Sequence, residues 1–378
     1  MKKLPRLVLL VSMLLTPFTA HAEPGVTDKT ILIGQSAALT GPAQELGLEM
    51  RLGAQLYFDQ INATGGINGR KLQLISLDDG YEPERAAANT KKLINDEKVL
   101  ALFAYVGTPT SAAALPIFTE AKVPFIGAFT GAELLRTPFN RYIFNVRASY
   151  FDETEKIVEH LTTTGVKKIA VFYQNDAYGK AGLAGMEKAM AKRNLKIAVT
   201  GTVERNSTEV AVATKTIAAA QPEAVVMVSA YKSVAAFVKS MKNAGSTTQF
   251  HNVSFVGSKP LATELGADGV GVAVAQVMPF PWSGSQAITR SYQEQLTKAG
   301  KSDLASFTSL EGYIAARVLA EGLKRAGSDL TRDRLISGLE SMSSIDLGGF
   351  NISYSPTSHN GSTLVDLTII GKSGKFMR

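Results

Sequence analysis

The sequence predicts an α/β protein with two doubly wound, Rossmann-like lobes, each built on a parallel sheet. Strand-length apolar runs alternate with helix-length segments in two successive series along the chain. The runs are continuously apolar, which is typical of parallel strands that helices cover on both faces. The chain of 378 residues is also longer than one hydrophobic core normally serves, so two lobes are expected.

The first series follows the N-terminal segment and alternates strand and helix without interruption, as βαβ units do. Its strands are predicted at Ile31–Ala37, Leu72–Leu77, Leu100–Val106 and Val123–Ala128, and its helices at Leu46–Asn62, Arg85–Asp96 and Thr110–Ala121.

The second series repeats this alternation. Its helices are predicted at Asp152–Thr164, Ala181–Arg193, Val210–Ala220 and Ser233–Ala244, and its strands at Lys168–Tyr173, Lys196–Thr202, Ala224–Ser229 and Val253–Val256. Beyond it, Met278-Pro279-Phe280-Pro281 predicts an extended segment, because proline fixes φ and lacks an N–H. Long helices are then expected at Ser285–Ala299, Ser309–Arg325 and Thr331–Met342.

The first 22 residues have the features of a secretory signal peptide. Three basic residues open the segment, Leu7–Leu15 is apolar, and Ala20-His21-Ala22 fits an A-x-A cleavage site. The apolar stretch is about half as long as the roughly 20 residues that a membrane helix needs. We therefore expect a cleaved leader and a periplasmic protein.

Composition excludes several classes of function. The formal charge of +7 falls to +4 without the three basic residues of the leader, and the lysines are dispersed, so no nucleic-acid surface is expected. The chain has no cysteine, which rules out disulfides, thiol catalysis and cysteine metal sites. The four histidines are scattered and no phosphate-loop motif occurs, so neither a metal nor another cofactor is expected.

The most informative stretch is Ile61–Glu84, INATGGINGRKLQLISLDDGYEPE, which predicts a helix end, a turn, a strand and a β-to-α loop. Together with YVGTPTS (105–111), FIGAFTGAELL (125–135) and NDAYGKAGL (175–183), it resembles the extracytoplasmic solute-binding proteins of ABC importers. The resemblance is to the branched-chain amino acid (Leu/Ile/Val)-binding family, with the type I periplasmic-binding-protein fold, and it covers the chain after residue 27.

This resemblance implies a hinge of three crossings between the lobes and a ligand cleft that closes on the solute. It also implies a non-enzymatic monomer that delivers its solute to permease subunits in the inner membrane. The crossings are expected near Val146–Ser149, Met278–Trp282 and Asn360–Leu364. The first lobe would comprise residues 23–147 and 282–362, and the second residues 148–281 and 363–378.

Ligands of open parallel sheets bind beyond the carboxyl ends of the strands. This rule places candidate contacts in loops of both lobes and in the crossings that border the cleft. They are Ser36–Gly41, Asp79–Tyr81, Val106–Ser111, Ala128–Gly131 (which includes Phe129), Tyr173–Tyr178, Ser229–Lys232, Gly257–Lys259, Tyr150 and Phe280–Trp282.

The segment Gly107–Thr110 is the candidate contact whose residue types indicate a binding role most clearly. Glycine lets the backbone approach a ligand, Thr108 suits a helix N-cap, and Pro109 suits the first helical position. Free amides at the positive end of a helix bind anions, so a carboxylate site is expected here. The alternative is a capped helix start without a ligand.

The resemblance implies further roles in binding. The residue matching Thr130 holds the ligand carboxylate through its hydroxyl, Ala128 matches the position whose carbonyl accepts the ligand ammonium, and Tyr231 matches a tyrosine that lies over the ligand. Aromatic side chains that either line the cleft or serve packing are Tyr81, Tyr150 and Trp282.

One position departs from the leucine-type binders. They place an acid in the second lobe against the ligand ammonium, whereas the matching residue here is Lys259. Either the solute lacks an amine, as an aromatic or 2-oxo acid does, or another acid such as Asp79 or Glu311 substitutes. A third possibility is that Lys259 points to solvent.

Two other functions compete with solute import. Ser229-Ala230-Tyr231-Lys232 fits the S-x-x-K motif of serine acyl-transfer enzymes and Lys372-Ser373-Gly374 resembles K-T-G, but the S-D-N element is absent. A ligand-sensing receptor module of the same fold is the other alternative, and nothing in the sequence separates it from an importer's binding protein.

Overall fold

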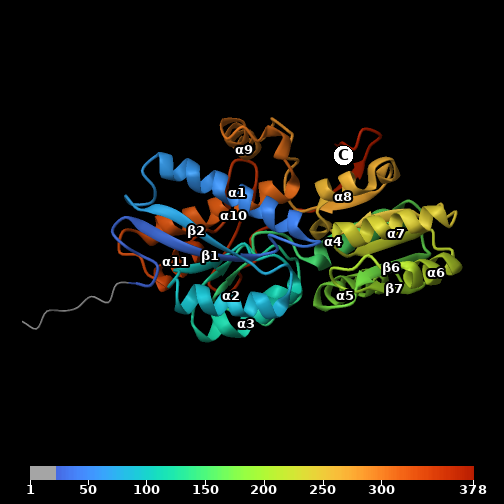
Figure 1. Ribbon diagram of the computed structural model, residues 1–378, viewed down its shortest axis with the longest axis horizontal. Coiled ribbons are helices and arrows are strands. Elements are labelled where there is room, and N and C mark those ends of the chain that lie inside the picture. Colours follow the sequence, from blue (N-terminus) through green and yellow to red (C-terminus); the bar gives the residue numbers. More distant parts are fainter. Residues whose placement is uncertain (1–22) are drawn as a thin grey trace, which may run out of the picture.

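The computed structural model describes residues 23–378, and the expected signal peptide lies outside them. Two sheets lie side by side, each covered by helices (Figure 1). The first sheet is wholly parallel, in the order β2-β1-β3-β4-β5. Its strands are β1 Thr30–Ala37, β2 Lys71–Asp78, β3 Ala101–Phe103, β4 Phe125–Ile126 and β5 Ile143–Phe144.

Helices cover both faces of the first sheet, with α2 and α3 on one face and α1 and α10 on the other (Figure 1). The helices α1 and α10 cross closely because Gly53 lies against the Ser309 carbonyl and Gly312 against the Met50 carbonyl. The helices of this lobe are α1 Gln44–Ala63, α2 Pro83–Asn95, α3 Thr108–Glu120, α9 Ala287–Lys298, α10 Phe307–Ala326 and α11 Arg332–Glu340, beside the strand pair β11 Ile345–Asp346 and β12 Asn351–Ile352.

The second sheet has the order β14-β13-β10-β9-β8-β6-β7, with β13 and β14 antiparallel at one edge. Its strands are β6 Ile169–Gln174, β7 Thr200–Val203, β8 Ala224–Val228, β9 Gln249–Asn252, β10 Ala273–Gln276, β13 Asp366–Ile370 and β14 Phe376–Met377. Its helices are α4 Tyr150–Thr163, α5 Ala177–Ala191, α6 Ala211–Ala220, α7 Tyr231–Asn243 and α8 Ser258–Leu265.

The chain passes between the sheets three times, after β5, after β10 and before β13. The first and third passages are joined, because Asn145 donates to the His359 carbonyl at 2.9 Å and accepts from the Gly361 amide at 2.8 Å. The boundaries predicted at residues 147, 281 and 362 fall between the strands of the two sheets and stay predictions. No helix within residues 23–378 is long and apolar enough to cross a membrane.

The predicted fold class is confirmed, with corrections to individual elements. The apolar run Val253–Val256 is not a strand, since Ser254–Val256 form a 3₁₀ turn and the strand β9 precedes it. The strand expected at Lys196–Thr202 starts only at Thr200. The helix α8, the short strand β5 and the strands β10, β13 and β14 were not predicted.

Candidate functional site

The N-terminal turn of α3 carries several unused hydrogen-bond donors. Gly107 precedes the helix with a φ of 102°, and Pro109 lies in its first turn. The amides of Thr108 and Thr110 donate to no acceptor among the described residues, and the buried Ser111 hydroxyl also lacks a partner there. Three free donors at the positive end of a helix suit an anion.

The Thr130 hydroxyl lies beside this turn. It is 2.7 Å from the Thr108 hydroxyl and donates to the Tyr150 hydroxyl at 3.3 Å. The Ala128 carbonyl accepts from the Thr130 amide at 2.9 Å. The structure thus brings Gly107, Thr108, Ala128, Thr130 and Tyr150 together, and their roles in holding a solute stay predictions.

Five buried aromatic rings from both lobes pack against one another. The ring centroid of Phe255 lies 5.9 Å from that of Tyr81, 5.1 Å from that of Phe129 and 4.5 Å from that of Tyr178. The rings of Tyr150 and Tyr178 are 5.4 Å apart. Each of the five is at most 1% exposed. We call Tyr81, Phe129, Tyr150, Tyr178 and Phe255 the aromatic cluster.

Polar contacts join the lobes next to the aromatic cluster. Gln174 at the end of β6 donates to the Tyr81 hydroxyl at 3.2 Å. Arg205 of the second lobe pairs with Glu82 of the first at 2.7 Å. The two lobes are therefore closed on each other in this structure.

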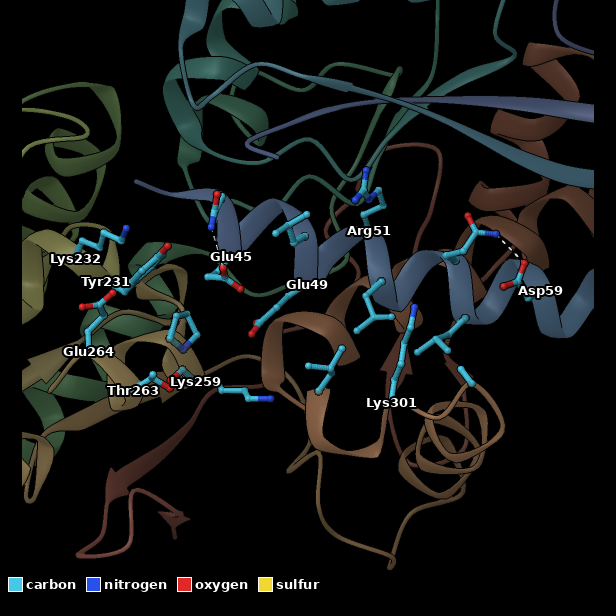
Figure 2. Close-up of a pocket in the computed structure, with 18 residues that line it drawn as sticks. Glu45, Glu49, Arg51, Asp59, Tyr231, Lys232, Lys259, Thr263, Glu264 and Lys301 are labelled. Carbon is cyan, nitrogen blue, oxygen red and sulfur yellow. Dashed lines mark hydrogen bonds between the residues drawn. The ribbon is translucent and has the colours of Figure 1, made fainter. Parts of the chain in front are cut away.

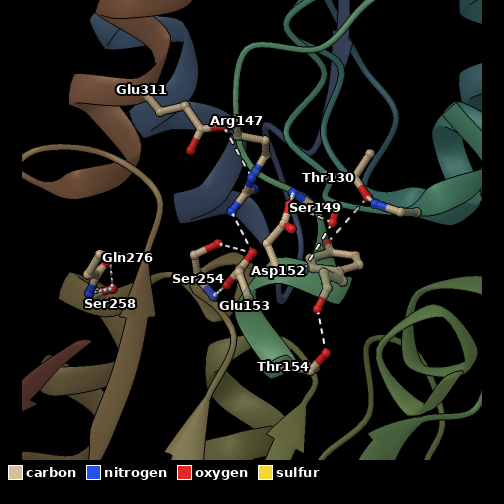
Figure 3. A network of polar contacts seen from close by, with 12 residues as sticks. Thr130, Arg147, Ser149, Asp152, Glu153, Thr154, Ser254, Ser258, Gln276 and Glu311 are labelled. Atoms are coloured by element: carbon tan, nitrogen blue, oxygen red, sulfur yellow. Dashed lines mark hydrogen bonds and ion pairs between the residues drawn. The ribbon is translucent and has the colours of Figure 1, made fainter. Parts of the chain in front are cut away.

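Three buried charged groups meet beside the aromatic cluster, where Arg147 lies over the Phe129 ring. Figure 3 shows these three groups. Arg147 in the first crossing has its guanidinium 3.5 Å from Glu153 of α4 and 3.6 Å from Glu311 of α10. Glu153 also accepts hydrogen bonds from the amide and the hydroxyl of Ser254, at 2.6 and 2.9 Å. We call Arg147, Glu153 and Glu311 the charge triad.

The charge triad has more acids than bases. Burial raises the pKa of Glu153 and raises the pKa of Glu311 to about 7, although Arg147 opposes both shifts. The two hydrogen bonds from Ser254 and the Arg147 guanidinium favour the carboxylate form of Glu153, whereas no hydrogen bond from the described residues favours the carboxylate form of Glu311. Glu311 is therefore the member that binds a proton near neutral pH.

Because of Glu311, the free energy of unfolding should fall as the pH rises. Its folded pKa of about 7 exceeds the ordinary value of 4.5, so its contribution is full below about pH 4.5 and is lost as the pH rises through about 7. Melting curves should show wild type losing stability relative to Glu311→Gln between these limits. Burial also raises the pKa of Asp79 and of Glu49, but both remain in the variant and cancel in the difference. Parallel pH curves would contradict the assignment.

Two predicted site residues, Tyr231 and Lys259, lie outside the aromatic cluster. They line a groove of about 680 Å³ between α1 and the helices α7 and α8, where Glu45 and Glu49 face them (Figure 2). The Lys259 amine donates to the carbonyl of Asp303. Lys259 thus bridges the lobes at this groove, and its contact with a solute stays a prediction.

Trp282 is also separate from the aromatic cluster. It is 42% exposed and lines a second groove, of about 720 Å³, with Phe280 and Phe376. Its ring stacks on that of Phe376 with centroids 5.9 Å apart. Trp282 therefore packs at the second crossing, and its contact with a solute stays a prediction.

Sequence reasoning missed the charge triad as a unit. Arg147 lies in the predicted crossing Val146–Ser149 and at the end of the predicted first lobe, but the sequence predicts no binding role for it or for Glu153. The available signals were an arginine within the apolar crossing and a glutamate directly after the Ser149–Asp152 capping box. Glu311 was considered only as a substitute acid, and the structure places it beside Arg147.

Buried polar atoms without a described hydrogen-bond partner gather at the carboxyl ends of strands from both sheets. Such atoms are rare in folded proteins, because an unpaired buried donor or acceptor is costly. They include Ser111 Oγ in α3, Arg147 Nε, Nη1 and Nη2 in the charge triad, Gln174 Oε1 at the end of β6, Tyr178 OH in the aromatic cluster and Ser229 Oγ after β8.

The acyl-transfer motif is not assembled into a catalytic site. Ser229 is fully buried at the end of β8, and its hydroxyl contacts no described base. Lys232 lines the groove of Tyr231 and Lys259, whereas Lys372–Gly374 lines the groove of Trp282.

Two doubly wound lobes that close over buried aromatic and unpaired polar groups define a two-lobed binding protein. The sequence profile described as periplasmic binding protein matches residues 30–375, and the chain belongs to this family. The family is one of solute-binding proteins, which agrees with the sequence-based prediction.

Similar proteins and a solved structure agree with the assignment to the periplasmic binding protein family. An amino acid binding protein of Pseudomonas aeruginosa is 26% identical over 240 residues, which are 62% of this chain and 63% of that protein. A leucine-, isoleucine-, valine-, threonine- and alanine-binding protein of the same species is 23% identical over 84% of both chains. The crystal structure of a possible leucine/isoleucine/valine-binding protein from Rhodopirellula baltica SH 1 has a TM-score of 0.88 and 34% identity, covering 93% of this chain and 97% of that one.

Proposed function

We propose that the chain binds a small carboxylate-bearing solute, an amino acid or an aromatic or 2-oxo acid, between its lobes and delivers it to an ABC importer from the periplasm. The observation that carries this proposal is the set of buried, unpaired polar atoms that both lobes present around the aromatic cluster. A bound solute would supply the missing partners and hold the lobes closed.

The turn at the start of α3 is the proposed carboxylate site. The amides of Thr108 and Thr110 and the hydroxyl of Ser111 offer free donors without a competing acid on the same turn. The Thr130 hydroxyl, which donates to Tyr150 in this structure, would turn to the carboxylate. The aromatic cluster would take the apolar part of the solute. Binding of amino acids by relatives fits this arrangement, since an amino acid is one kind of carboxylate.

A thermal-shift screen of the mature protein tests the function. The panel holds amino acids, 2-oxo acids and aromatic acids, with amines and sugars as controls. A solute at about 100 times its Kd should add about 2.7 kcal/mol to stability, because only the folded protein binds it. A panel in which no carboxylate raises the melting temperature would overturn the proposal.

Thr130 offers a direct test of the carboxylate site. Thr130→Val keeps the side-chain shape but removes the hydroxyl, so affinity for a carboxylate found in the screen should fall by about 1.5–3 kcal/mol, the usual worth of a hydrogen bond to a charged group. Thr130→Ser keeps the hydroxyl and should retain most of the affinity. Calorimetric titration measures both. Equal affinities of Thr130→Val and wild type would remove Thr130 from the site.

A further inference from the structure

Arg147 is the most deeply buried cation of the described chain and the least satisfied. Its side chain is 1% exposed, and none of its three guanidinium nitrogens has a hydrogen-bond partner among the described residues. The nearest carboxylate oxygens, at 3.5 and 3.6 Å, are beyond good hydrogen-bond distance. The guanidinium carbon lies 4.8 Å from the centroid of the Phe129 ring, so it borders the aromatic cluster.

The unpaired guanidinium of Arg147 can only donate hydrogen bonds. The unpaired hydroxyls of Tyr178, Ser229 and Ser111 can either donate or accept, and Gln174 Oε1 can only accept. A solute group that satisfies Arg147 must therefore present an oxygen acceptor. An ammonium is a donor only, so beside Arg147 it would leave the guanidinium unpaired and add like-charge repulsion.

The charge balance of the site also limits which kind of acceptor the solute can present to Arg147. Arg147 and the carboxylate of Glu153 balance each other, and Glu311 binds a proton near neutral pH, so it supplies no fixed charge for an ammonium. A second carboxylate on the solute would bring another negative charge into a buried site that has no spare cation. A neutral carbonyl oxygen accepts from Arg147 without changing the charge.

We propose, on the basis of the carboxylate-binding function proposed above, that Arg147 binds the solute by donating to a carbonyl oxygen next to the solute carboxylate, and that the preferred solutes are 2-oxo acids with an apolar or aromatic side chain. The carboxylate lies at the α3 turn and the side chain lies in the aromatic cluster. This preference does not depend on Lys259, whose amine donates to the carbonyl of Asp303.

Calorimetric titration of the mature protein with matched solutes tests the inference. Each pair differs only at the carbon next to the carboxylate: phenylpyruvate with phenylalanine, and 4-methyl-2-oxopentanoate with leucine. At least one 2-oxo acid should bind about tenfold or more tightly than its amino acid, which corresponds to 1.4 kcal/mol. Tighter binding of both amino acids would overturn the inference and leave the proposed function intact. Binding of no carboxylate in these pairs or in the wider panel would overturn both.

Single-residue variants test whether Arg147 causes the preference for 2-oxo acids over amino acids. Arg147→Lys keeps the charge but loses the planar fork of donors, so the ratio of 2-oxo acid to amino acid affinity should fall about tenfold or more. Arg332→Lys is the matched control, because Arg332 donates to the carbonyls of Val99 and Leu100 within the first lobe, and its ratio should equal that of wild type. An unchanged ratio in folded Arg147→Lys would overturn the assignment. If that variant does not fold, the ratio is measured in Phe129→Leu, which removes the ring beside the guanidinium, and the same criterion applies.

Discussion

Replacing Glu153 and Glu311 together by glutamine is expected to destabilise the protein by about 3–5 kcal/mol, the usual cost of leaving a buried charge without its partner. Both carboxyls are buried, and they are the two acids that pair with Arg147. With both neutral, the guanidinium would stay in the interior without a counter-charge. Chemical denaturation in the absence of solute measures the loss.

The single variants should show that one acid is sufficient. In Glu311→Gln, Arg147 keeps Glu153, which Ser254 also holds through two hydrogen bonds. In Glu153→Gln, the pKa of Glu311 should fall, because its carboxylate becomes the sole partner of Arg147. The double variant should therefore lose more stability than the sum of the two single losses. Glu155→Gln, which breaks exposed pairs with Lys192 and Arg193, is the control and should cost less than about 1 kcal/mol. Strictly additive losses at Glu153 and Glu311 would contradict a shared role.

The sequence predicted strands β1 and β2 of the first lobe well, whereas β3 and β4 are shorter than predicted and β5 was not predicted. Ile31–Ala37 and Leu72–Leu77 are apolar runs that end at turn residues, and the observed strands match them within one residue. Strand β9 is different, because three of the four residues of its sequence QFHN are polar and it becomes a strand by pairing between β8 and β10. The apolar run after it forms a 3₁₀ turn that places Phe255 in the aromatic cluster.

The candidate site also has a part that could be predicted from the sequence and a part that could not. The α3 turn could be predicted because Gly107, Thr108 and Pro109 are adjacent and have clear backbone preferences. The charge triad could not, because Arg147, Glu153 and Glu311 come from a crossing and from two helices that meet only when the lobes assemble. Lys259 was placed by likeness to relatives, and its contact with Asp303 depends on a loop of the other lobe.

Gly107→Ala should produce the second large effect, on both stability and solute binding. The glycine has a φ of 102°, which L-residues rarely adopt, and an added Cβ would lie 2.2 Å from Cε2 of Tyr81. Backbone strain and overpacking each cost about 1–3 kcal/mol. Because the turn must shift to relieve the clash, the amides of Thr108 and Thr110 would leave the proposed carboxylate site.

A second glycine allows the two costs of Gly107→Ala to be separated. Gly65 has a φ of 100°, but an added Cβ there would meet nothing within 4 Å. Gly65→Ala should therefore show the strain alone and leave solute affinity unchanged, whereas Gly107→Ala should lose about 1–3 kcal/mol more stability and at least about tenfold in affinity. Denaturation and calorimetric titration of both variants, with a solute from the screen, measure the difference. Equal losses at the two glycines would show that Tyr81 does not press on the α3 turn, and would remove that contact from the closed cleft.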